Sequence, residues 1–155
     1  MPAVGQDRYV DPDRRLPGFD GSMLTGALLT LFGYLIPWFK QSPRYQWSYS
    51  GWNYASLSSG GGWTLWTFVF ILAAIVASFW ARTILGAAMT ALTAAVGTLV
   101  FSLAVVAASF GAIGERSSSN AVADMPFGLG LPLLAVGLGL LVATACRDIA
   151  LNADR

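Results

Sequence analysis

The sequence predicts an all-α membrane protein: a four-transmembrane-helix bundle with a small aromatic β-hairpin in its first outer loop. Charged residues make up only 11% of the 155 residues, against about 25% in a typical soluble domain. Charges divide the chain into four uncharged, mostly apolar stretches, and about 20 such residues cross the hydrocarbon core of a bilayer. Between the first two stretches, aromatic residues alternate with polar ones, which is typical of strands.

The predicted spans are residues 23–39, 63–81, 83–114 and 127–146. We expect residues 22–146 to form the membrane domain, between a disordered cytoplasmic tail (1–21) and a shorter cytoplasmic tail (147–155). The third stretch is longer than a bilayer requires, so its last turns are expected to project into water.

Single residues mark the predicted ends of the spans. Arg82 is the only charged residue between positions 63 and 114, and it predicts a tight turn between the second and third spans. Ser22 and Asp124 are expected to cap the first and fourth spans. Pro37 is expected to kink the first span near its outer end, and Pro132 to kink the fourth over Gly128.

The distribution of Lys and Arg predicts the orientation. One side of the membrane carries six of them: Arg8, Arg14, Arg15, Arg82, Arg147 and Arg155. The other side carries three, namely Lys40, Arg44 and Arg116. Because positive charge favours the cytoplasmic side, both termini are predicted to be cytoplasmic. Arginine outnumbers lysine eight to one, and this composition favours a bacterial inner membrane.

Small residues predict how the helices pack, because close approach and interhelical hydrogen bonds drive association in lipid. The third span carries such a stripe at Gly86, Thr90, Ala94, Thr98 and Ser102, and the fourth carries one at Ala135, Gly139 and Ala143. We expect the threonine hydroxyls to bond between helices. These faces are either all used within one chain, or one of them remains for a homo-oligomer or a membrane-protein partner.

The first outer loop, residues 40–62, has the most distinctive sequence of the chain. Tyr45, Trp47 and Tyr49 alternate with polar residues before Ser50-Gly51, and Trp52 and Tyr54 alternate after it. This pattern predicts a hairpin with its turn at Ser50-Gly51. Its aromatic residues form an interfacial cap, a partner-binding patch or a surface that stacks a flat ligand. For partner binding, the candidates are Trp47, Tyr49, Trp52 and Tyr54.

This arrangement resembles the claudin-type tetraspan architecture. Both termini inside, a tryptophan-bearing first outer loop, an overlong third helix and a short second loop are the shared features. The loop here lacks the cysteine pair of that family, because Cys146 is the only cysteine. The resemblance implies a structural or partner-binding role, and no residue roles are carried over.

Several chemistries are excluded by composition. The chain has no histidine, so it cannot form a histidine zinc site or a Ser-His-Asp relay. No charged residue lies inside a predicted span, which argues against a pump or a proton-coupled transporter. A net charge of +1 gives no support for a nucleic-acid partner. The N-terminal acids Asp7, Asp11, Asp13 and Asp20 are expected in a disordered tail and not in a metal cage.

The sequence therefore predicts a non-enzymatic membrane protein without metal or cofactor. We expect an accessory subunit or scaffold that binds a partner through its aromatic outer loop. The alternative is an oligomeric passive channel or small-molecule facilitator, lined by Thr25, Thr30, Thr90 and Thr98.

Overall fold

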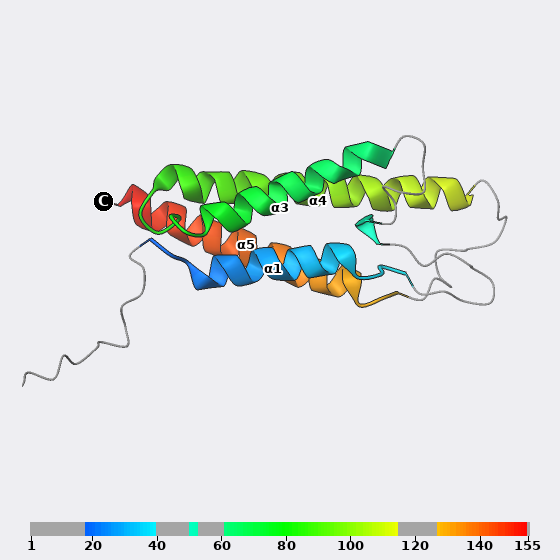
Figure 1. Cartoon of the computed structure of the whole chain (residues 1–155), viewed down its shortest axis with the longest axis horizontal. Helices are drawn as coiled ribbons and strands as arrows, with labels where there is room; N and C mark the ends of the chain where they lie inside the picture. Colours follow the sequence, from blue (N-terminus) through cyan, green and yellow to red (C-terminus); the bar gives the residue numbers. More distant parts are fainter. Residues whose placement is uncertain (1–17, 40–49, 53–60, 115–126, 155) are drawn as a thin grey trace, which may run out of the picture.

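The computed structural model describes residues 18–39, 50–52, 61–114 and 127–154, with the backbone alone for 108–114. Its four α-helices run lengthwise (Figure 1). They are α1 (Gly21–Leu35), α3 (Trp66–Ala77), α4 (Leu85–Gly114) and α5 (Gly130–Ala153), and a 3₁₀ helix, η1 (Gly61–Leu65), leads into α3. Within these ranges there is no strand, only an isolated antiparallel bridge between Phe39 and Phe127.

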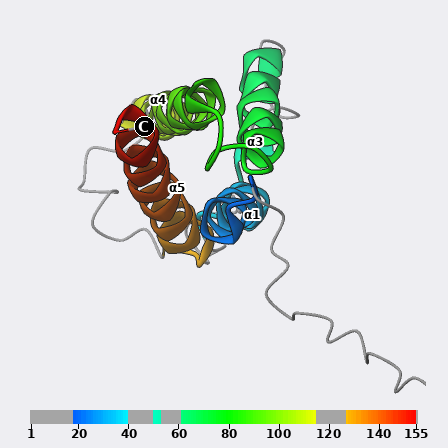
Figure 2. The ribbon, with the colours of Figure 1, turned by 90° about the vertical axis from the view of Figure 1, so that its left-hand side faces the viewer.

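The helices form a ring in which each one has two neighbours. Seen along the helices, α1 packs between α3 and α5, and α4 completes the ring on the other side (Figure 2). Fully buried side chains fill the interior, the largest of them being Trp38, Tyr34, Met23 and Leu141. The closest pair is α1 with α5.

Two of the helices are long and apolar enough to cross a membrane, by length and composition: Leu85–Ala107 within α4, and α5. The other two apolar helices, α1 and Gly62–Ala77, are shorter. The four expected helices are therefore present, and two of them reach the length of a span. After α1, the chain continues as non-helical backbone to Phe39.

The ends of α1 differ from the expectation. Asp20, not Ser22, is the N-cap, and its side chain accepts a hydrogen bond of 2.9 Å from the Met23 N–H. The helix ends at Leu35, where Ile36 turns to extended backbone because a residue before proline disfavours helical backbone. Pro37 therefore ends the helix and does not kink it.

The start of α5 also needs correction. The helix begins at Gly130 after Leu129, which makes no side-chain cap, and the expected cap Asp124 lies outside the described residues. Pro132 therefore falls in the first turn of α5, where the backbone N–H groups have no partner within the helix. Pro132 replaces no hydrogen bond there, so it does not kink the helix.

The turn between α3 and α4 confirms the expected break at Arg82. Ala77 ends α3, Leu85 starts α4, and turn-type hydrogen bonds connect the residues between them, such as Thr83 N–H to the Trp80 carbonyl at 3.0 Å. The two helices consequently lie antiparallel (Figure 1).

Glycines bring α1 and α5 together. A Cβ built on Gly26 would lie 2.9 Å from the Leu141 nitrogen, and one on Gly33 or Gly137 would overlap the backbone of the opposite helix. Small residues let backbones approach in this way when apolar burial cannot drive association. Gly26 and Gly33 stand seven positions apart, and so do Gly130 and Gly137.

Candidate functional site

The predicted partner-binding residues fall mostly outside the described chain. Trp47, Tyr49 and Tyr54 lie there, as does most of the predicted hairpin. Trp52 is described, and its side chain is 50% exposed. Gly51 and Trp52 have helical backbone, so the expected Ser-Gly turn and the start of a second strand are not formed at these two residues.

The described part of this loop is anchored to the helices. The Trp52 ring meets Phe68 of α3 edge-on, with centroids 5.5 Å apart, and Gly51 packs against the Tyr34 ring. Tyr34 also contacts Phe68 and Trp38, and its hydroxyl donates to the Thr64 carbonyl at 3.2 Å. Glycine is required at position 51, because a Cβ would overlap the Tyr34 ring.

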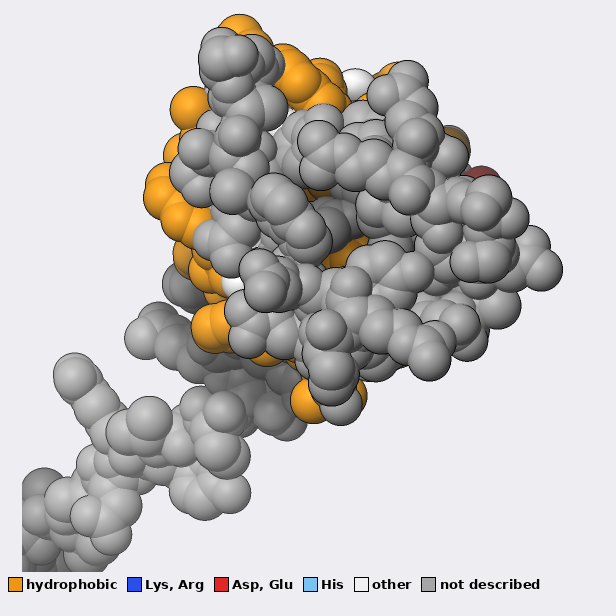
Figure 3. Space-filling view, turned by 90° about the vertical axis from the view of Figure 1, so that its right-hand side faces the viewer, with side chains coloured by type: hydrophobic (Ala, Val, Ile, Leu, Met, Phe, Trp, Pro, Cys, Tyr) orange, Lys and Arg blue, Asp and Glu red, His pale blue; other side chains and the backbone are white. Residues whose placement is uncertain are grey.

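We call Tyr34, Trp38, Trp52 and Phe68 the outer aromatic platform. Tyr34 and Trp38 are fully buried, whereas Trp52 is half exposed. Figure 3 views this end of the molecule, where hydrophobic side chains of the described residues show mainly along the left side of the view. The platform fixes one exposed tryptophan on a buried support.

The residues expected to pack the helices divide into two groups. In α4, Ala94, Thr98 and Ser102 are buried, whereas Gly86 and Thr90 are exposed. In α5, the stripe formed by Ala135, Gly139 and Ala143 lies on the outside, and nothing lies within 4 Å of a Cβ built on Gly139.

The α5 expectation therefore needs correction within this chain. The face that packs carries Leu134, Gly137, Leu138 and Leu141. This face of α5 points inward because α5 packs most closely against α1. Gly137 lies opposite the backbone of Thr30, where a side chain would not fit.

In the expected stripe of α4, the hydroxyls of Thr90 and Thr98 bond within the helix and not between helices. Thr30, Thr98 and Thr144 each donate to the carbonyl four residues earlier in their own helix, at 2.8 Å. Such local bonding satisfies a hydroxyl without a partner helix. Close packing therefore holds these helices together at these positions.

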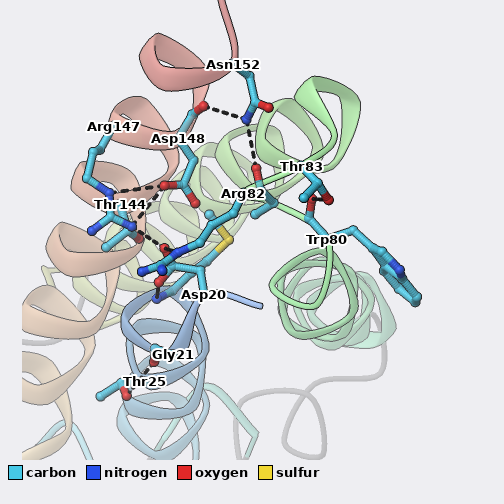
Figure 4. A network of polar contacts seen from close by, with 12 residues as sticks. Asp20, Gly21, Thr25, Trp80, Arg82, Thr83, Thr144, Arg147, Asp148 and Asn152 are labelled. Carbon is cyan, nitrogen blue, oxygen red and sulfur yellow. Dashed lines mark hydrogen bonds and ion pairs between the residues drawn. The ribbon is translucent and has the colours of Figure 1, made fainter. Parts of the chain in front are cut away.

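A second site, which the sequence analysis missed, lies at the opposite end of the bundle from the platform. Figure 4 shows Asp20, Arg82, Arg147 and Asp148 meeting there; we call these four residues the charged cluster. Asp20 Oδ2 accepts from Arg82 Nε at 3.1 Å and from Arg147 Nη2. Arg147 also binds Asp148 Oδ1, through Nη2 at 2.9 Å and Nε at 3.1 Å.

Burial in the charged cluster is uneven. Both carboxylates are fully buried, whereas the side chains of Arg82 and Arg147 are 39% and 43% exposed. A fifth residue, Asn152 of α5, donates a hydrogen bond from its side-chain amide to the Ala81 carbonyl at 3.0 Å. The charged cluster thus joins α5 to the N-terminus of α1 and to the turn between α3 and α4.

The electrostatics of Asp20 follow from these contacts. Burial raises the pKa of its carboxyl, but the Met23 N–H bond, the hydrogen bond from Arg82 and the charges of Arg147 and Arg82 outweigh it, so the pKa falls from 3.8 to about 2. Asp20 is therefore ionised at neutral pH and acts both as a helix cap and as the anion between two arginines.

The charged cluster holds two atoms of particular interest. Asp148 Oδ2 is buried without a hydrogen-bond partner, and Nη1 of Arg147 has no acceptor in the part of the chain that the structure describes. The described residues include no group of three His, Cys, Asp or Glu side chains that could hold a metal ion. The neighbouring Cys146 is exposed.

Sequence reasoning placed Asp20 in a disordered tail because Asp7, Asp11 and Asp13 precede it. A signal was available in the sequence: Asp20 is the last charged residue before the first apolar stretch, and the pair Arg147-Asp148 directly follows the fourth. Only the fold shows that these positions meet.

Comparisons of the chain with family models, curated proteins and solved structures gave no match. The two sites described above therefore carry the functional argument.

Proposed function

We propose that this chain is an integral protein of the cytoplasmic membrane with four spans and both termini in the cytoplasm. In this proposal it acts as a non-enzymatic accessory subunit or scaffold and binds a partner membrane protein through its aromatic outer loop.

The distribution of charge is the observation that carries the proposal. In the described part of the chain, the charged residues are Asp20, Arg82, Arg147, Asp148 and Asp154, and all lie at the same end of the bundle. Large apolar side chains are exposed along every helix, among them Phe32, Leu72, Val100 and Val136. An apolar exterior of this extent favours contact with lipid.

The shorter helix α1 fits the proposal when the non-helical segment that follows it is included. At about 1.5 Å per residue, α1 alone is short for a hydrocarbon core of about 30 Å. The non-helical segment from Ile36 to Phe39 adds length, and its carbonyls at Pro37 and Trp38 accept from Gly130 at 3.2 Å and Gly128 at 2.7 Å. Non-helical backbone is tolerated at membrane depth when protein satisfies it in this way.

Partner binding is assigned to the outer aromatic platform and the loop that it anchors. Tryptophan and tyrosine are favoured at the centres of protein interfaces, because they bury large areas and lose little conformational entropy. Trp52 meets this description, since its ring is held against Phe68 and half exposed. Trp47, Tyr49 and Tyr54 extend the same segment.

The test is replacement of Trp47, Tyr49, Trp52 and Tyr54 by alanine, followed by gentle detergent extraction and identification of co-purifying proteins. We expect the partner to be lost while the helical content stays unchanged. The matched control is Trp80→Ala, which removes an equally exposed tryptophan (51%) at the opposite end. A partner retained at full yield by the fourfold variant would contradict the proposal.

The mass of the extracted particle tests the alternative, an oligomeric passive channel. A homogeneous oligomer of this chain alone would favour the channel. Thr30 and Thr98 are fully buried inside one bundle. Of the four threonines expected to line a channel, Thr25 and Thr90 are the two that are exposed and could line a pathway between subunits.

A further inference from the structure

We propose that the partly exposed side chains of Arg82 and Arg147 bind the phosphate of an anionic phospholipid at the cytoplasmic surface of the membrane. This inference rests on the proposed function, because it requires the charged end of the bundle to lie where lipid headgroups meet water.

The first supporting observation is that both arginines bind the same oxygen atom. Arg82 reaches Asp20 Oδ2 from the turn between α3 and α4, and Arg147 reaches it from α5. The two guanidinium groups consequently lie next to each other (Figure 4). A second anion placed against both of them would relieve their mutual repulsion.

The second observation is the direction in which the charges face. The charged cluster is neutral overall if all four groups are ionised, but both carboxylates are fully buried and both guanidinium side chains are about two-fifths exposed. The surface that the cluster presents is therefore cationic. Nη1 of Arg147 has no acceptor among the described residues, and guanidinium N–H groups match the oxygens of phosphate.

The third observation selects a lipid over a free anion. Next to Arg82 in the chain, Phe79 and Trp80 are both exposed, and the outer face of α3 continues this apolar surface through Val76 and Leu72. Tryptophan is enriched at the level of lipid headgroups. A bound phospholipid can place its phosphate on the arginines and its acyl chains along α3, whereas free phosphate gains nothing from the apolar surface.

Native mass spectrometry of the full chain in mild detergent tests this inference, with phosphatidylglycerol and phosphatidylcholine at equal concentrations. The quantity measured is the ratio of the two bound lipids. The test variant is Arg147→Gln with Asp148→Asn, which removes both members of this partly exposed ion pair together and leaves no unpaired Asp148 carboxylate. The matched control is Asp154→Asn with Arg155→Gln, an adjacent pair at the same terminus. Neither double variant changes the net charge of the chain.

We expect the unmodified chain to prefer phosphatidylglycerol, and the test variant to lose about fivefold of that preference, the effect of one arginine at about 1 kcal/mol near an anionic surface. The control should keep the preference. If the test variant does not fold, Arg147→Lys retains the ion pair but loses the planar fork, and it should also lower the ratio.

Equal binding of the two lipids by the unmodified chain, or an unchanged ratio in the test variant, would overturn the inference. Competition by inorganic phosphate at the same concentration as the lipid would show that the site takes a free anion and would overturn the lipid assignment. A chain that stays in solution without detergent would instead contradict the proposed function, so the two failures are distinguishable.

Discussion

At the scale of single residues, Gly137 and Gly139 form a matched pair on α5. A Cβ on Gly137 would overlap the Thr30 backbone of α1, whereas one on Gly139 would meet open space. We predict that Gly137→Ala destabilises the fold by about 1–3 kcal/mol, because backbone atoms cannot move aside as a flexible side chain would. Gly139→Ala should be neutral or stabilise by up to about 1 kcal/mol through higher helix propensity.

Unfolding in mixed detergent micelles measures both free energies under one set of conditions. Equal destabilisation by the two substitutions would contradict the packing described for α1 and α5. It would also indicate that the face with Ala135, Gly139 and Ala143 is covered by another molecule.

Asp20 predicts a dependence of stability on pH. Its pKa is about 2 in the folded chain against an ordinary value of 3.8. Since the folded pKa is the lower one, the ionised carboxylate stabilises the fold above about pH 3.8, and this contribution of about 2 kcal/mol disappears as the pH falls through 2.

The check is a comparison of thermal unfolding midpoints for the unmodified chain and Asp20→Asn across this pH range. We expect Asp20→Asn to unfold at a lower temperature than the unmodified chain at neutral pH. The difference between the two midpoints should become smaller as the pH approaches 2. A difference between the midpoints that does not depend on pH would contradict the assigned role of the Asp20 charge.

At the scale of elements, the outer end of α1 depends on a side chain beyond the helix. Trp38 is fully buried, and its Nε1–H donates to the Gly33 carbonyl at 2.8 Å. Gly33 lies in the last turn of α1, where carbonyls have no partner within the helix. We predict that Trp38→Phe costs about 1–3 kcal/mol, because it leaves a buried carbonyl unpaired and removes packed volume.

The control for this prediction is Trp66→Phe, which makes the same chemical change at a tryptophan that is 60% exposed. Its free energy of unfolding should remain within about 0.5 kcal/mol of the unmodified chain. A cost at Trp66 equal to that at Trp38 would show that loss of the indole itself, and not of its buried hydrogen bond, determines stability.

How far the sequence predicts this fold also differs by element. The spacing of charges predicted four helices and the break at Arg82, because uncharged apolar length is a property of each segment alone. The inward face of α5 was not predictable in this way. Small residues occur on two of its faces, Gly130 with Gly137 and Ala135 with Gly139 and Ala143, and only the approach of α1 selects between them. Both faces satisfy the same pattern in the sequence.

The candidate sites show the same limit over longer distances. Asp20 and Arg147 are 127 positions apart in the chain and share a hydrogen bond, and no local pattern connects them. The expected cap of α1 was wrong for a related reason: Asp20 and Ser22 are both good N-cap residues, and the position of Arg82 and Arg147 favours Asp20. Of the four aromatic residues that the sequence singled out, the structure describes only Trp52, which is half exposed. The buried support that Tyr34 and Phe68 give to Trp52 was not predicted.

At the scale of the whole molecule, length and charge are both distributed asymmetrically. The longer helices α4 and α5 lie beside each other, as do the shorter helices α1 and α3. In a bilayer, a shorter hydrophobic length is accommodated by local thinning or by association with other proteins. The side formed by α1 and α3 also carries the platform residues Tyr34 and Phe68, so the same side is where we expect a partner to bind.

The charge asymmetry leads to a prediction of topology. The start of α1, the turn at Arg82 and the end of α5 meet in the charged cluster, so they must lie on one side of a membrane that the bundle crosses. In a Cys146→Ser background, we predict that the Asp154→Cys variant reacts with a membrane-impermeant maleimide only after the cells are permeabilised. The Ser118→Cys variant should react in intact cells. Ser118 lies between the third and fourth apolar stretches of the sequence, outside the described residues. The excess of positive charge on the side of the termini is the physical reason, and labelling of both positions in intact cells would contradict the four-span proposal.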